Sequence, residues 1–153
     1  MADQSLSRTP LHAWHSAHGG RRVEFAGWEM PVQYGSIADE HVATRNAAGL
    51  FDISHMGRLE FDGDRALPFL DRLVTRRVAN MKAGQIRYAL ITNPQGGILD
   101  DVLVYRLQPA DGTPRTMMVV NASNRGKIVA WLQQHVRAAD ALTIRDVTCA
   151  TAM

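Results

Sequence analysis

The feature that most restricts the fold is a pair of strongly apolar segments separated by a turn signal. Residues 85–93, QIRYALITN, and residues 98–107, ILDDVLVYRL, are rich in β-branched, aromatic and other apolar side chains, which favours strands. The NPQGG cluster between them, residues 93–97, is typical of a turn. The sequence therefore predicts an antiparallel hairpin, and with it a fold built around a sheet.

The segments before and after this hairpin predict further strands and two helices. RLEFDG, residues 58–63, and RTMMVVNA, residues 115–122, predict strands. Residues 64–74 carry a helical apolar stripe, with Pro68 placed in the first turn, and a second helix is predicted from Ser123 as its N-cap. The order strand, helix, three strands, helix predicts an α+β fold: an antiparallel sheet with flanking helices in a ferredoxin-like arrangement.

The two ends of the chain give different signals. SIADEHVATRNAAG, residues 36–49, predicts a helix capped by Ser36 and followed by Gly49. FAGWEMP, residues 25–31, contains Gly and Pro and is interpreted as a structured loop. The last residues begin as a strand from Ala141 and stop with no polar tail. We therefore expect the chain to be a fragment of a longer protein.

Composition excludes several classes of protein. Hydrophobic residues make up 46% and charged residues 21%, as in globular proteins and unlike disordered ones. No apolar run approaches the roughly 20 residues that cross a bilayer, so no membrane association is expected. The arginines are scattered and accompany no nucleic-acid-binding motif, so no nucleic-acid partner is expected.

Single residues exclude two further kinds of site. Cys149 is the only cysteine, so an intrachain disulfide is impossible. His12, His15 and His18 have i, i+3 spacing, but no carboxylate or cysteine completes a ligand set, and Gly19 follows at once. We therefore predict no metal site.

Two aspartates interrupt the second strand of the hairpin. Side chains alternate along a strand, so Asp101 shares a face with Leu103 and Tyr105, while Asp100 lies on the opposite face. The two carboxylates therefore do not form a paired acid–base site. The residues alone leave two alternatives. Either both carboxylates are half exposed and hydrogen-bonded near the hairpin end, or one of them binds a small ligand in a pocket with aromatic walls.

Four long stretches of this sequence resemble one family. They are RTPLHAWHSAHGGRRVEFAGWEMPVQY, SIADEHVATRNAAGLFDISHMG, IRYALITNPQGGILDDVLVYRL and MMVVNASNRGKIVAWL. Together they resemble the N-terminal portion of the aminomethyltransferase family, the T-protein of the glycine cleavage system, over roughly residues 8–153. The resemblance implies the aminomethyltransferase folate-binding fold. It places residues 1–55 in a discontinuous first domain, residues 56–144 in a ferredoxin-like second domain, and residues 145–153 in a return strand to the first.

The resemblance also implies an activity. In the family, the one-carbon unit of an aminomethyl group bound to the H-protein is transferred to tetrahydrofolate, with release of ammonia. The implied co-substrate is therefore tetrahydrofolate, and the implied partner is the lipoylated H-protein. A cytoplasmic location in a bacterium is expected, since no transit peptide is visible. The family's other folate contacts are implied beyond Met153, so the isolated chain is expected to be inactive.

The resemblance assigns residues as well. The second aspartate of the DD pair, Asp101, is implied to be catalytic, because a fixed carboxylate stabilises positive charge that develops on nitrogen. The implied substrate- and folate-binding residues are Met56, Tyr88, Asp101, Leu103, Tyr105, Val119 and Asn121. For Asp100 we expect a hydrogen-bonded, partly exposed strand residue.

Two other classes of function remain open from the sequence. One is another folate-dependent module, such as a demethylase or the folate domain associated with a dehydrogenase. The other is a non-catalytic, truncated domain.

Overall fold

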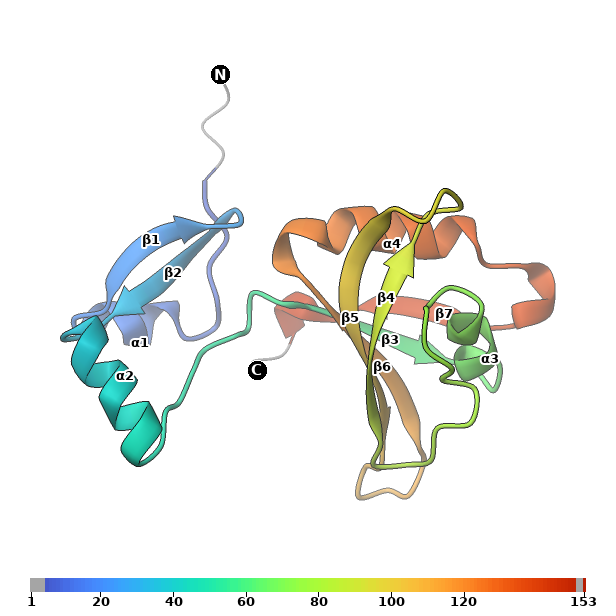
Figure 1. Cartoon of the computed structure of the whole chain (residues 1–153), viewed down its shortest axis with the longest axis horizontal. Coiled ribbons are helices and arrows are strands. Elements are labelled where there is room, and N and C mark those ends of the chain that lie inside the picture. The colour runs from blue at the N-terminus through green and yellow to red at the C-terminus, as the bar shows by residue number, and fades with distance from the viewer. Residues whose placement is uncertain (1–4, 151–152) are drawn as a thin grey trace. The chain divides into compact units, whose positions relative to one another are not determined.

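A computed structural model describes residues 5–150 and 153. The chain divides into two compact units, one formed by residues Met1–His55 with Cys149–Met153 and the other by Met56–Thr148. Figure 1 labels the elements of both units. Within the described ranges, no helix is long and apolar enough to cross a membrane.

The smaller unit contains a hairpin that the sequence analysis missed. Helix α1 (His12–Ala17) is followed by strands β1 (Arg21–Phe25) and β2 (Trp28–Gln33), which pair antiparallel, and then by helix α2 (Ile37–Asn46). The prediction of a loop over residues 25–31 is therefore wrong. Ala26 and Gly27 both have positive φ, 53° and 80°, which is the geometry of a two-residue hairpin turn whose twist matches the strands.

The start of α2 confirms its predicted cap. The Ser36 hydroxyl accepts a hydrogen bond from the Asp39 backbone N–H at 3.4 Å. Glu40 reaches back to the preceding turn, where its carboxylate accepts from the N–H groups of Tyr34 and Gly35 at 2.7 and 2.9 Å. The helix ends at Asn46, before the predicted Gly49.

A buried histidine–aspartate pair ties the smaller unit together. His15 Nε2 lies 2.7 Å from Asp52 Oδ2, and His15 Nδ1 lies 2.5 Å from the Tyr34 hydroxyl. The Ser54 backbone N–H donates to Asp52 at 2.9 Å. Burial acts to raise the pKa of Asp52, but hydrogen bonds from Ser54 and His15 outweigh it and lower that pKa to about 2.

This shift predicts that Asp52 makes the smaller unit sensitive to acid. The ordinary pKa of the group is 3.8, so as the pH falls the unfolded chain binds the proton before the folded one does. The contribution of Asp52 to stability is complete above pH 4 and is lost between about pH 4 and 2, a loss of about 2 kcal/mol. Urea unfolding at pH 5 and pH 2.5 checks this. Asp52→Asn should be less stable than the wild type at pH 5 and should lose less on acidification, whereas equal losses would contradict the assignment.

The larger unit is built on a five-stranded sheet in the order β4-β5-β6-β3-β7. Its elements are β3 (Gly57–Asp62), α3 (Ala66–Asp71), β4 (Ile86–Thr92), β5 (Ile98–Leu107), β6 (Arg115–Val120), α4 (Arg125–Gln134) and β7 (Thr143–Asp146). Every neighbouring pair of strands is antiparallel. This confirms the predicted α+β class. The β5-β6-β3-β7 part has the ferredoxin-like order, and β4 adds an outer strand.

One domain boundary of this unit differs from prediction. Residues 143–146 pair with β3, so the first part of the predicted return strand, 145–153, belongs to the larger unit's sheet instead. The chain then makes a short 3-10 turn, Thr148–Ala150, and joins the smaller unit from Cys149. Residues 151 and 152 of that prediction, like residues 1–4 of the predicted first domain, lie outside the described residues. The rest of the domain assignment stays a prediction.

The start of α4 also differs. A 3-10 turn, Ala122–Asn124, precedes it, and among the described residues no side chain caps the helix at Asn124. Ser123 is therefore not the N-cap. The side chain of Asn124 instead donates to Asp100 on the neighbouring strand.

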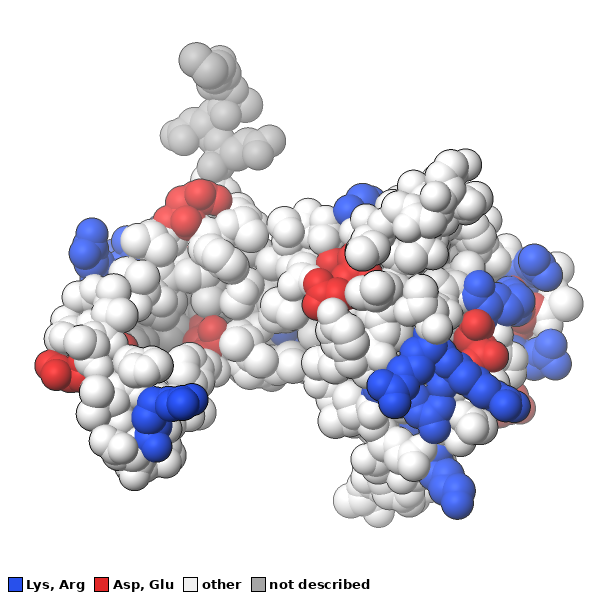
Figure 2. Space-filling view, in the orientation of Figure 1, with Lys and Arg blue, Asp and Glu red and all other residues white. Residues whose placement is uncertain are grey.

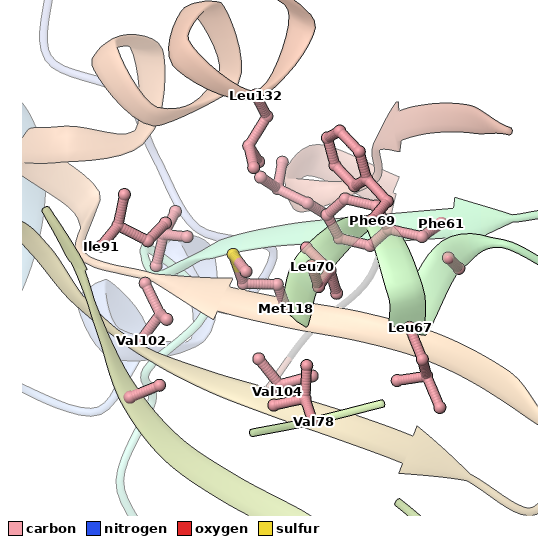
Figure 3. Packing of buried hydrophobic residues seen from close by; sticks show 14 of the residues in the cluster. Phe61, Leu67, Phe69, Leu70, Val78, Ile91, Val102, Val104, Met118 and Leu132 are labelled. Carbon is pink, nitrogen blue, oxygen red and sulfur yellow. The ribbon is translucent and has the colours of Figure 1, made fainter. Parts of the chain in front are cut away.

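The core of the larger unit lies between the sheet and its two longer helices. Alternate residues of the strands, among them Ile91, Val102, Val104 and Met118, pack against Phe69 and Leu70 of α3 and Leu132 of α4 (Figure 3). Pro68 is the third residue of α3, within its first turn as predicted. Because α3 and α4 pack on one face of the sheet, the alternate side chains of the strands project to the other.

Candidate functional site

We call the sheet face opposite α3 and α4 the open face. Directly paired residues of an antiparallel sheet project to the same side. Tyr88 pairs with Leu103, which pairs with Val119, so all three lie on this face. Asp101 and Tyr105 follow by alternation along β5. The register thus brings residues from three strands together, as the candidate site requires.

The remaining predicted residues flank this face at one end of the sheet. Asn121 directly follows β6, and the register of the β5–β6 pair, continued by two residues beyond Leu103 and Val119, sets it opposite Asp101. Met56 directly precedes β3, where Gly57 pairs with Val120. The backbone oxygen of Met56 accepts a hydrogen bond from Arg58 Nη1 at 2.9 Å.

The two aspartates differ in exposure, and Asp100 is the buried one. Asp100 is only 3% exposed, whereas Asp101 is exposed. The expectation of a partly exposed Asp100 is therefore wrong, although the expected hydrogen bonds exist. Its carboxylate accepts from the Asn121 backbone N–H at 3.0 Å, from Asn121 Nδ2 at 2.9 Å and from Asn124 Nδ2 at 2.6 Å. These three donors compensate for the loss of water around the buried group.

Asp101 is held at the surface by one of the same side chains. Its Oδ1 accepts from Asn121 Nδ2 at 2.8 Å, and its backbone oxygen lies 3.2 Å from the same nitrogen. Partial desolvation, and then the charge and hydrogen bonding of Asp101, raise the pKa of the Tyr88 phenol. Asp101, Tyr88 and Asn121 therefore form one polar cluster, and Tyr88 keeps its proton at neutral pH.

Apolar side chains surround this cluster to different degrees. Leu103 is half-buried, and Val119 is 2% exposed yet lies outside the cluster of residues packed beneath the helices. Tyr105 is four residues along β5 from Asp101, about 13 Å at the rise of a strand. It therefore belongs to the open face but not to the polar cluster.

The arrangement is suited to binding a cationic or N–H-bearing ligand. An exposed carboxylate is fixed by an amide and bordered by an aromatic and two aliphatic side chains. Among the described residues, no group of three or more His, Cys, Asp or Glu is placed to hold a metal ion.

Other surface features of the larger unit do not coincide with this cluster. A hollow of about 510 Å³ lies between the C-terminal end of α4 and the segments on either side of β4, and none of the predicted site residues lines it. Figure 2 shows Lys and Arg side chains gathered over the segment that joins α3 to β4, to which Arg76, Arg77 and Lys82 belong. The site is therefore defined by side-chain chemistry on a sheet face and not by a deep cavity.

Sequence reasoning missed Asn124. The one feature of the sequence that could have indicated its role is the pair of asparagines, Asn121 and Asn124, three residues apart and directly after a strongly predicted strand.

Comparison with known proteins adds independent information. The family described as GCVT N-terminal domain matches residues 11–153. The aminomethyltransferase of Desulforamulus reducens is 46% identical over 151 residues, which cover 98% of this chain and 40% of that protein. The aminomethyltransferase of Bacillus subtilis is 45% identical over 130 residues, 85% of this chain and 35% of that protein.

A solved structure agrees with these relatives. The crystal structure of glycine cleavage system aminomethyltransferase T from Bartonella henselae superposes with a TM-score of 0.84 at 36% identity, and covers 94% of this chain and 39% of that one. The chain thus spans no more than 40% of the length of these proteins.

Proposed function

The chain belongs to the GCVT N-terminal domain family, and we propose that the protein carrying it is the tetrahydrofolate-dependent aminomethyltransferase of the glycine cleavage system. The observation that carries this proposal is the exposed carboxylate of Asp101, fixed by Asn121 beside Tyr88 on the open face. The names of the similar proteins support the reaction class.

The proposed reaction makes use of a fixed negative charge. A nitrogen of tetrahydrofolate attacks the aminomethyl carbon carried on the dihydrolipoyl arm of the H-protein. The carbon forms bonds to N5 and N10 of the folate, while its bonds to the sulfur of the arm and to the amine nitrogen break. The two protons that N5 and N10 lose go to the sulfur and the amine, so the products are 5,10-methylenetetrahydrofolate, the reduced arm and ammonia. Positive charge develops on nitrogen, and the carboxylate of Asp101 stabilises it and orients the N–H group.

The other residues receive binding roles in this proposal. Leu103 and Val119 supply apolar contact for the folate, and Met56 extends it at the end of β3. Tyr88 lines the site with its ring, and its hydroxyl hydrogen-bonds to Asp101. Tyr105 contacts the part of the folate farthest from Asp101. No metal takes part in the proposed reaction.

The proposal also includes a partner and a location. The donor is the lipoylated H-protein, and the reaction takes place in the cytoplasm of a bacterium. The bacterial origin of the similar aminomethyltransferases supports the location.

A choice of donor substrates tests the function. With tetrahydrofolate present, the complete protein that carries this chain should form 5,10-methylenetetrahydrofolate and ammonia from aminomethylated H-protein, and none from an N-methyl amino acid supplied with a flavin dehydrogenase. Product from the N-methyl amino acid alone would replace the proposal by the second candidate, a dehydrogenase-associated folate module. If neither donor gives product, the remaining alternative is a non-catalytic domain.

A further inference from the structure

The carboxylates of two successive residues, Asp100 and Asp101, accept hydrogen bonds from the same side-chain nitrogen. Asn121 Nδ2 lies 2.9 Å from Asp100 Oδ1 and 2.8 Å from Asp101 Oδ1. Asp100 also accepts from Asn124 Nδ2 and from the backbone N–H of Asn121. Asp100 therefore binds three N–H donors, and one of these donors also binds Asp101.

These contacts fix which way the Asn121 amide faces. An ionised carboxylate only accepts hydrogen bonds, and an amide presents two N–H donors on one side and an acceptor oxygen on the other. With a carboxylate oxygen on each side of the nitrogen, the NH₂ group must face both aspartates. The amide oxygen of Asn121 then faces away from them.

The burial of the two aspartates separates their roles. Asp100 is 3% exposed and shares a strand face with the core residues Val102 and Val104, so it does not contact a ligand on the open face. Asp101 is exposed. An exposed side chain samples several rotamers unless a neighbour restrains it. Here the restraining group is the Asn121 amide, which is itself held by Asp100.

We propose that Asp100 is a positioning residue, which holds the amide of Asn121 so that this amide fixes the carboxylate of Asp101 for reaction. The proposal rests on the proposed function of Asp101. The competing role for Asp100 is purely structural, because its other two donors close the junction between β6 and α4.

A double-mutant cycle separates the two roles. Asp100→Asn keeps the shape of the side chain but replaces one carboxylate oxygen by an NH₂ group, so the Asn121 amide is no longer held in one orientation. In otherwise wild-type protein, kcat should fall on the order of 10- to 100-fold, with little change in KM for tetrahydrofolate. In an Asp101→Asn background, the same substitution should change kcat less than about twofold, because no carboxylate remains to be positioned. Asp111→Asn, at an exposed aspartate paired with Arg115, is the matched control and should change neither constant.

Each outcome of the cycle is decisive. Equal losses of kcat in both backgrounds, or no loss in the wild-type background, would overturn the positioning role while leaving the proposed function intact. If Asp101→Asn alone leaves kcat unchanged, the proposed role of Asp101 fails, and the positioning role fails with it. Should Asp100→Asn not fold, Asp100→Ser enters the same cycle. Loss of the fold in both variants would assign Asp100 a structural role and overturn the proposal.

Discussion

Replacing Asp101 by asparagine should lower kcat roughly 100- to 10,000-fold while leaving the fold intact. Asparagine keeps the shape of the side chain and an oxygen that accepts from Asn121, but it carries no negative charge. Stabilisation of the positive charge that develops on nitrogen is lost, and this loss affects the transition state more than the bound substrates. KM for tetrahydrofolate should therefore change little.

Stability measurements and a control complete this experiment. Because Asp101 is exposed, the free energy of unfolding should change by no more than about 0.5 kcal/mol. Asp111→Asn removes a comparable surface carboxylate, 51% exposed in its ion pair, and should retain full turnover. Unchanged turnover in Asp101→Asn would remove Asp101 from the reaction.

Replacing Phe69 by alanine should destabilise the larger unit by about 3–5 kcal/mol. The Phe69 ring is fully buried in α3, lies 6.3 Å from the ring of Phe61 between centroids, and is covered by the guanidinium of Arg72 at 5.4 Å. Alanine would leave a cavity between α3 and the sheet, and this close-packed region cannot collapse to fill it. Urea unfolding measures the loss.

A substitution on the surface of the same unit is the control for Phe69. Ile98 lies at the start of β5 and is 64% exposed, so Ile98→Ala should cost no more than about 0.5 kcal/mol. A loss below about 1 kcal/mol in Phe69→Ala would contradict the packing described for α3.

The sheet was predictable because its signals are local. The β4–β5 hairpin follows from two apolar segments and the cluster Asn93–Gly97, and the side chains of β5 alternate as the sequence indicates. The same alternation places Asp101 with Leu103 and Tyr105. That assignment needs only the period of a strand, so it could be made from the sequence.

The prediction of a loop over residues 25–31 failed because a local sequence preference was misleading there. The Gly and Pro of residues 25–31 indicated a loop, but Ala26 in the left-handed region and Gly27 allow a two-residue turn between two strands. Nothing in the sequence marks Ala26 as a residue with positive φ, because alanine is rarely found there.

The burial of Asp100 depended on residues distant in sequence. An isolated aspartate in a strand favours exposure, and only the amides of Asn121 and Asn124, more than twenty positions away, make burial tolerable. A 3-10 turn, Ala122–Asn124, precedes α4, and the sequence does not distinguish it from a helix that begins after Ser123. The catalytic and binding roles assigned to the open face remain predictions, since they depend on a ligand and not on the fold.

The central claim is that the protein carries an aminomethyl carbon to tetrahydrofolate at the open face. A single turnover with carbon-13 in the aminomethyl group of lipoylated H-protein tests it most directly, with the product observed by NMR. The label should appear in the methylene bridge of 5,10-methylenetetrahydrofolate, together with one equivalent of ammonia, and Asp101→Asn should slow its appearance. Label that stays on the carrier in the presence of folded protein and saturating tetrahydrofolate, or that leaves it equally fast without tetrahydrofolate, would contradict the claim.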